Sequence, residues 1–213
     1  MSKNSIYTFD YFQPSEYRFS LDSVFLAQLV AKKYENHPQL SELTFLDLCS
    51  GCGVIGLELA IHLPQILNID FLEVQEIYRN YFQQNLRGIK GDQFQGNFQL
   101  IENNYAQFNL DQNHKYDVIL SNPPYFFKEE GLLSPSEFKN RCRFFLDANF
   151  LELIQCILRS LKIGGEAFVL LRPGSHHGRD LFCELKEIVG PNNLAEIFGE
   201  VRGTNVIRIL KQS

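Results

Sequence analysis

The residues best suited to chemistry form the tetrapeptide Asn122-Pro123-Pro124-Tyr125, at the end of an apolar run. The Asn122 side-chain carbonyl and the Pro123 backbone carbonyl both accept hydrogen bonds, and Pro124 fixes the direction of the second without adding an N–H donor. Two converging acceptors match the two hydrogens of a planar –NH2 group and aim its lone pair out of the plane. Tyr125 can stack on a flat substrate. A Pro-Pro strand terminator without chemistry is the structural alternative.

A glycine-rich segment, "DLCSGCGVIG", is the second chemical feature. Gly51, Gly53 and Gly56 form the pattern G-x-G-x-x-G between a predicted strand and a predicted helix. Glycine lets the backbone approach a ligand closely, although a tight structural turn would use the same residues. Asp47, just before this loop, could orient it or attract a positively charged ligand group.

Two further polar residues end predicted strands. Glu73 could hold ribose hydroxyls through both carboxylate oxygens, and a solvated strand end is the alternative. Asn104 could bond an adenine edge, and a simple turn residue is the alternative there.

The elements that must position these residues alternate along the chain. Predicted strands cover 43–49, 68–74, 97–103, 116–122, 166–173 and 205–211, and predicted helices cover 21–34, 51–63, 75–88, 147–164 and 179–190. Such alternation predicts an α/β fold, a Rossmann-like, doubly wound and mostly parallel sheet with an antiparallel edge strand. Ligands of these sheets bind outside the carboxyl ends of the strands. We therefore expect the chemistry just after Cys49, Val74, Asn103 and Asn122.

Helix ends follow from capping signals. Gly88 is expected to close the helix at 75–88. In the helix at 147–164, Phe150, Ile154, Ile157, Leu158 and Leu161 share one face, Asp147 is the expected N-cap, and Gly164 is the expected stop.

Composition bounds the class of protein. A chain of 213 residues, 45% hydrophobic and 21% charged, suits a single domain over residues 1–213. No apolar stretch approaches the ~20 residues of a membrane helix, and "MSKNSIYTFD" has no apolar signal core. Five cysteines give no disulfide framework. These features predict a soluble, cytoplasmic protein without membrane partners, and we favour a monomer. The net charge of −5 argues against a uniformly basic surface and leaves room for a local basic patch.

The motifs together carry a family resemblance. The chain resembles class I S-adenosylmethionine (SAM) methyltransferases that modify amino groups: "DLCSGCGVIG" is similar to their first motif, "FLEVQE" to their ribose-binding acid, and "SNPPY" to their catalytic tetrapeptide. Within that superfamily it most resembles the bacterial valine-tRNA adenine-N6 methyltransferases, through "YRFSLDSVFLAQLV", "SNPPYF" and "RCRFFLDANFLELI". The resemblance spans about residues 15 to 211.

The resemblance implies a cofactor, SAM, and a role for each residue. Residues 43–213 would form the core, and 1–42 a helical and loop extension that closes the cofactor pocket. The methionine part would lie over the glycine loop, the ribose against Glu73, and the adenine against Asn104, where relatives usually have Asp. The implied cofactor-binding residues are Asp22, Asp47, Ser50, Gly51, Cys52, Gly53, Glu73, Val74, Asn104 and Asn122. The implied catalytic residues are Asn122, Pro123, Pro124 and Tyr125.

Basic and aromatic residues beside the tetrapeptide are the candidates for substrate contact. A run of basic residues is usually a solvated surface, but this one lies next to the proposed pocket. The substrate candidates are Tyr125, Phe126, Lys128, Arg141 and Arg143, with Lys139 as a further basic residue. His176 and His177, in the glycine-rich loop "RPGSHHGRD", are lesser candidates for phosphate contact alongside Arg172 and Arg179, and a solvated loop is the alternative. Cys49 and Cys52 form C-x-x-C, but no second pair at zinc spacing exists, so we expect packing and no metal.

The expected activity is SAM-dependent N-methylation, with adenine N6 in tRNA or another structured RNA as the expected substrate. Glutamine N5 methylation of a protein is a rival, because an amide –NH2 presents the same two hydrogens. Relatives with that task usually carry a helical domain before the core, whereas about forty residues precede the first strand here. A non-catalytic SAM- or RNA-binding module is another alternative. A dehydrogenase would share the glycines but leave the tetrapeptide unexplained.

Overall fold

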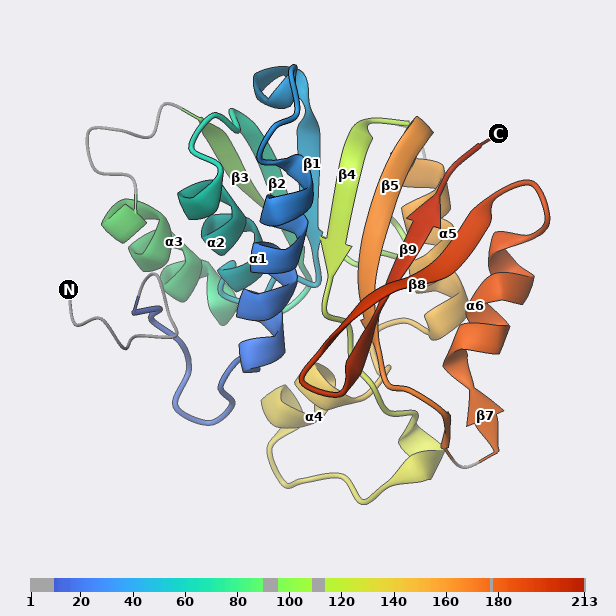
Figure 1. The fold of residues 1–213 in the computed structure, drawn as a ribbon. Coiled ribbons are helices and arrows are strands. Elements are labelled where there is room, and N and C mark those ends of the chain that lie inside the picture. The colour runs from blue at the N-terminus through green and yellow to red at the C-terminus, as the bar shows by residue number, and fades with distance from the viewer. Residues whose placement is uncertain (1–9, 90–95, 109–113, 177, 213) are drawn as a thin grey trace.

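Seven strands form one sheet in the order β3-β2-β1-β4-β5-β9-β8 in the computed structural model, which describes residues 10–89, 96–108, 114–176 and 178–212 (Figure 1). The strands are β1 (Thr44–Leu48), β2 (Asn68–Glu73), β3 (Asn97–Glu102), β4 (Tyr116–Ser121), β5 (Leu161–Leu171), β8 (Leu194–Val201) and β9 (Thr204–Leu210). The first five in this order pair in parallel, whereas β9 pairs antiparallel with β5, and β8 antiparallel with β9. The predicted Rossmann-like sheet with an antiparallel edge is confirmed.

Helices cover both faces of this sheet (Figure 1). They are α1 (Leu21–Tyr34), α2 (Val54–His62), α3 (Tyr78–Ile89), α4 (Glu137–Arg143), α5 (Phe150–Ser160) and α6 (Leu181–Val189). Short 3-10 turns span Leu40–Glu42 and Lys128–Glu130, and a small hairpin pairs β6 (Ser175–His176) with β7 (Arg179–Asp180). Successive side chains of a strand point to opposite faces, so Phe45 packs with α1 and α2 while its neighbour Leu46 packs with α5. The sheet is therefore buried on both sides.

The ends of α5 differ from the prediction. Its N-cap is Asn149, which forms a reciprocal capping box with Glu152, and not Asp147. The helix stops at Ser160, where the chain turns directly into β5. Gly164 consequently lies within β5, with a positive φ of 83°, and does not end a helix. The prediction that Leu161 shares a helix face with Phe150 and Ile154 is wrong, because Leu161 is the first residue of β5. It resembled a helix position because it packs in the same buried cluster.

Other elements also differ from the predicted ones. Gly88 lies inside α3, which ends one residue later. Neither α4 nor β8 was predicted. α4 has seven residues with four charged side chains, too short for an apolar period. β8 lies at the edge of the sheet, is mostly half-exposed, and changes register between Ile197 and Gly199, so its sequence has no continuous apolar run.

The segment before α1 is tied to the helices that flank the glycine loop. The Tyr11 hydroxyl donates to Glu58 Oε2 of α2 at 2.7 Å. Asn85 of α3 accepts from the Phe12 backbone N–H at 2.7 Å and donates to both the Phe12 and the Cys52 carbonyls, at 2.9 and 3.0 Å. The segment from residue 10 therefore crosses α2 and α3 toward the loop. Residues 1–9 lie outside the described part, and the boundary at 42/43 stays a prediction.

No helix in the described part of the chain combines the length and the apolar character that crossing a membrane requires. The cytoplasmic location stays a prediction.

Candidate active site

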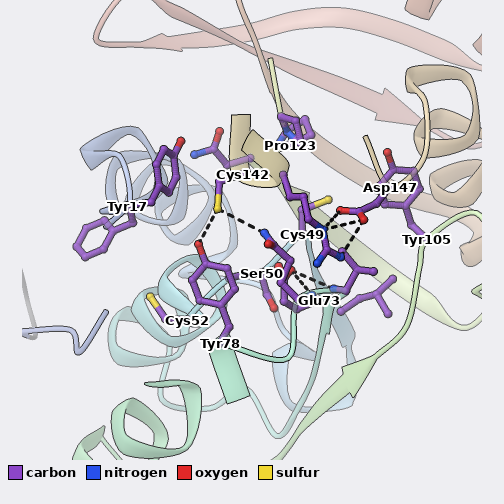
Figure 2. A pocket seen from close by; sticks show the side chains of 18 of the residues that line it. Tyr17, Cys49, Ser50, Cys52, Glu73, Tyr78, Tyr105, Pro123, Cys142 and Asp147 are labelled. Atoms are coloured by element: carbon purple, nitrogen blue, oxygen red, sulfur yellow. Dashed lines mark hydrogen bonds and ion pairs between the residues drawn. The ribbon is translucent and has the colours of Figure 1, made fainter. Parts of the chain in front are cut away.

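One cavity opens at the carboxyl ends of the parallel strands (Figure 2). Its lining includes all four positions at which we expected the chemistry, which are Cys49 after β1, Val74 after β2, Asn103 after β3 and Asn122 after β4. The glycine loop, the strand-end acid and the tetrapeptide therefore meet in one site. The predicted gathering of these strand ends is confirmed.

The glycine loop turns sharply through left-handed backbone conformations. Cys49, Gly51 and Gly53 have φ of 63°, 54° and 86°. A left-handed backbone is uncommon for cysteine and costs free energy. Because Cys49 has this conformation, it cannot continue the strand, and β1 ends one residue earlier than predicted. A Cβ on Gly53 or Gly56 would lie 2.7 or 2.5 Å from a phenylalanine ring, so these two glycines allow close helix packing. Gly51 lines the cavity.

Asp47 is fully buried beneath the loop. Its Oδ2 accepts from the Gly56 backbone N–H at 2.9 Å, in the first turn of α2. The carboxylate thus satisfies a helix N-terminus, where negative charge is favourable. Burial nevertheless raises the pKa of Asp47 to about 7, against the lowering effect of the Gly56 bond. Asp47 is thus bonded to α2 directly after the loop, and its two predicted roles stay predictions.

Glu73 joins the loop after β1 to the loop after β2. Its Oε2 accepts from the Gly51 N–H at 2.9 Å, and its Oε1 accepts from the N–H groups of Val74 and Gln75 at 3.0 and 2.9 Å. Burial raises the pKa of this carboxyl, while the three amides oppose the rise. A carboxylate has about four acceptor sites, so one site on Oε2 is left for a ligand hydroxyl.

This wall offers an acceptor to a polar ligand. Within the described residues, two buried side-chain oxygens have no hydrogen-bond partner, Asp47 Oδ1 and Ser50 Oγ. Buried polar atoms are normally paired, and Ser50 lines the cavity, so its Oγ suits a ligand that brings an N–H or O–H donor. Asp47 is not part of the lining. Three tyrosine rings, those of Tyr17, Tyr78 and Tyr105, add flat surfaces to the lining for an adenine (Figure 2).

The tetrapeptide forms the facing wall, and all four of its residues line the cavity. The Asn122 amide is held at both ends: Nδ2 donates to Ser23 Oγ of α1 at 2.9 Å, and Oδ1 accepts from the Tyr125 hydroxyl at 2.5 Å. Burial raises the pKa of Tyr125, so this hydroxyl keeps its proton at neutral pH. Tyr125 therefore covers the acceptor that we assigned to an amine.

The residues after the tetrapeptide are fixed to the end of α4. The N–H groups of Tyr125 and Phe126 both donate to the Arg143 carbonyl, at 3.1 and 3.0 Å, and the Phe126 carbonyl accepts from Phe145 at 2.8 Å. The rings of Phe126 and Phe144 lie 5.5 Å apart. The end of α4 thus positions the rings of Tyr125 and Phe126.

Two of the predicted residues have other partners than expected. Asn104 donates to the Asp147 carbonyl at 2.7 Å and accepts from the Ala106 N–H at 2.9 Å, and its neighbour Asn103 lines the cavity instead. Asp22 lies 3.7 Å from Arg202, whereas Ser20 and Ser23 on either side of it line the cavity. The adenine contact of Asn104 and the closing role of Asp22 stay predictions.

Several lining residues were not among the predicted site residues. Cys142 Sγ lies 3.2 Å from the Tyr78 hydroxyl and accepts from Gln75 Nε2 at 3.4 Å (Figure 2). Asp147, expected to cap a helix, instead pairs with Arg141 at 2.8 Å in the cavity wall. The signal that could have found them is the family resemblance, because Gln75 lies in "FLEVQE", and Cys142 and Asp147 lie in "RCRFFLDANFLELI".

The remaining predicted residues are placed as follows. Ser50, Cys52 and Arg141 line the cavity, whereas Phe126, Lys128 and Arg143 lie outside its lining. Burial raises the pKa of the Cys52 thiol to about 12 and that of Cys49 well above its usual value, so neither is a thiolate at neutral pH. In the described ranges, no group of three or more His, Cys, Asp or Glu side chains is arranged to hold a metal ion.

The fold and this site define a class of protein. The family model of the methyltransferase small domain matches residues 19–135, more than half of the chain. The chain belongs to this family of methyltransferases.

Among its relatives are proteins named tRNA1(Val) (adenine(37)-N6)-methyltransferase. The one from Histophilus somni strain 2336 is 29% identical over 60% of this chain and 52% of its own length. The one from Dyadobacter fermentans is 30% identical over 59% of this chain and 49% of its own length. The chain therefore spans about half the length of the curated relatives it matches.

Solved structures share the fold. TrmN from Thermus thermophilus aligns with a TM-score of 0.57 at 20% identity, covering 88% of this chain and 48% of that one. A putative RNA methyltransferase from Pyrococcus horikoshii aligns with a TM-score of 0.59 at 15% identity, covering 97% and 92%.

Proposed function

We propose that this protein transfers a methyl group from SAM to the N6 amine of an adenine in tRNA. The observation that carries the proposal is that the Asn122–Tyr125 tetrapeptide faces the glycine loop and Glu73 across one cavity. The family is one of methyltransferases, and the named relatives support adenine N6 in tRNA as the substrate.

On the cofactor side, Glu73 would receive a ribose hydroxyl on the free site of Oε2, and Ser50 Oγ and the rings of Tyr78 and Tyr105 would contact the rest of the ligand. When bound, SAM supplies an electrophilic methyl group. Because the loop amides are already held by Glu73, little reorganisation is needed before binding, and proximity and orientation become the main catalytic contributions.

On the amine side, the Asn122 and Pro123 carbonyls would accept the two amine hydrogens and direct the nitrogen lone pair into the cavity. The Tyr125 hydroxyl must leave Asn122 Oδ1 for this to happen, because it occupies that acceptor at 2.5 Å. Rotation of Tyr125 would also free its ring to stack on the adenine. With its pKa raised, Tyr125 is no base, and the proton would pass to solvent after the transfer.

An adenine within a folded RNA would have to leave its stack to reach Asn122, since only the extruded base can enter a cavity. An unpaired adenine costs least to extrude, which favours a loop position.

The test is radiolabelled SAM transfer to total RNA and to total protein, followed by digestion of labelled RNA to nucleosides. We expect label in RNA and N6-methyladenosine as the labelled nucleoside. Label in protein alone would assign the site to glutamine. S-adenosylhomocysteine (SAH) binding without transfer to either pool would make the chain a binding module.

A further inference from the structure

Arginine side chains lie over the aromatic rings that follow the catalytic asparagine. The guanidinium carbon of Arg172 lies 5.5 Å from the centre of the Tyr125 ring and 4.3 Å from that of Phe126. The guanidinium carbon of Arg143 lies 5.3 Å from the Phe126 ring and 5.6 Å from the Phe144 ring. Two cations from different elements, the end of α4 and the segment after β5, thus share one ring next to the cavity.

The neighbouring arginines are neutralised, and these two are not. Arg141 pairs with Asp147, and Arg179 pairs with Glu184 at 2.8 and 2.6 Å. Among the described residues, neither Arg143 nor Arg172 has a carboxylate within ion-pair distance. Both are half-buried. A partly desolvated cation without a counter-ion favours an anion from outside the protein.

Their geometry suits one kind of anion. A guanidinium that packs its flat face on a ring keeps the N–H groups along its edge for hydrogen bonds, and that edge matches phosphate bidentately. Burial raises the pKa of Tyr17, which lines the cavity, and the charges of both arginines oppose this rise, so their charge reaches the cavity. A nucleotide whose base lies beside Asn122 must leave its own backbone outside the cavity, against these residues.

We propose that Arg143 and Arg172, supported by the Phe126 ring, bind the phosphodiester groups that flank the nucleotide to be methylated. The proposal rests on the proposed nucleic-acid substrate and assigns particular residues to the contact with its backbone. The other basic candidates are less suited, because Arg141 is paired with Asp147 and Lys128 is exposed to solvent.

The experiment measures binding of a fluorescent RNA stem–loop with an unpaired adenosine, by anisotropy, over a series of salt concentrations. The test variant is Arg143→Gln/Arg172→Gln. The matched control, Lys32→Gln/Arg87→Gln, removes the same amount of charge. Lys32 lies in the last turn of α1 and Arg87 in the last turn of α3, each far along its helix from the cavity-lining residues at its start. SAH affinity, read by calorimetry, shows that each variant is folded.

We expect the test variant to bind RNA at least tenfold more weakly, and its log–log salt slope to fall by about 1.4, as two single-strand phosphate contacts require. The control should have a salt slope close to that of the wild type, because its two lost charges lie far from the cavity and act on RNA only through the net charge of the protein. Arg172→Lys should keep the slope and lose part of the affinity, because it retains charge without the planar edge.

The outcomes separate this proposal from the proposed function. If the wild type methylates RNA while the test variant keeps affinity and slope, the phosphate contacts are overturned and the function stands. If the slope falls as expected but no RNA is methylated, the contacts stand and the function fails. Loss of binding to an acidic peptide with unchanged RNA binding would overturn the proposal in favour of a protein partner.

Discussion

The two walls of the cavity are held together by different kinds of contact. In the glycine-loop wall, residues 49–53 and 73–75 with the buried Asp47 behind them, carboxylates bind backbone amides: Asp47 holds Gly56 of α2, and Glu73 holds three N–H groups. The facing wall, which we call the amine wall after its proposed role, consists of residues 122–125, 141–142 and 144–148, and there the Asn122 amide is held by the side chains of Ser23 and Tyr125. The first wall is preformed, whereas under the proposed function the second would exchange a partner to admit an amine.

This difference predicts how the walls respond to substitution. Changes in the glycine-loop wall should alter cofactor affinity and folding stability together, since the same carboxylates serve both. Changes in the amine wall should alter turnover while cofactor affinity stays constant. The four predictions below test this difference, two in each wall.

Asn122→Ala should lower methyl transfer by at least about 100-fold, because it removes one of the two acceptors that orient the amine. SAH affinity, measured by calorimetry, should stay within a few-fold, since Asn122 faces the reacting end of the ligand. Full turnover in this variant would show that the tetrapeptide has no catalytic role.

Asp47→Asn should flatten the pH dependence of stability. A carboxyl whose folded pKa is raised to about 7 stabilises the fold below its unfolded pKa of 3.8 and loses that contribution as the pH rises through 7. The free energy of unfolding of the wild type, relative to the variant, should therefore fall by on the order of 4 kcal/mol across that window. Urea unfolding at several pH values measures it. A difference that is constant with pH would show that Asp47 titrates normally.

Glu73→Ala should weaken SAH binding by roughly 1–3 kcal/mol, as for a lost hydrogen-bonded charged group. It should also lower the free energy of unfolding without ligand, because three backbone amides lose their acceptor. Calorimetry and urea unfolding report the two effects separately. Weakened binding with unchanged stability would contradict the joint role of this wall.

Ser23→Ala should lower turnover by about tenfold, the equivalent of one hydrogen bond of about 1.4 kcal/mol. Without Ser23 Oγ, the Asn122 amide is free to turn its –NH2 toward the amine. Ser23→Thr keeps the hydroxyl and should restore turnover, and SAH affinity should not change in either variant. If Thr fails to rescue while Ala behaves as expected, the role of Ser23 is packing.

The sequence by itself determined the features that depend on local chemistry. Alternating patterns predicted the parallel sheet, and its carboxyl ends located Cys49, Val74, Asn103 and Asn122 at one cavity. Glycine and proline positions were informative around the loop after β1 and the tetrapeptide, because their backbone constraints act within a few residues. Helix ends were less accurate: neither Gly88 nor Gly164 ends a helix, and of the two good N-cap residues Asp147 and Asn149 it is Asn149 that has a capping-box partner, Glu152, three residues later.

Only the tertiary structure decided which partner each polar side chain has. Asn122 and Ser23 are 99 residues apart in the chain, and Cys142 is 67 residues from Gln75. Such pairs have no local pattern, since their contact exists only once α1 and α4 pack against the sheet. For the same reason, the positions of the arginines in the sequence could not show which of them are paired with a carboxylate. The structure shows that Arg141 pairs with Asp147, whereas Arg143 and Arg172 lie over the Phe126 ring.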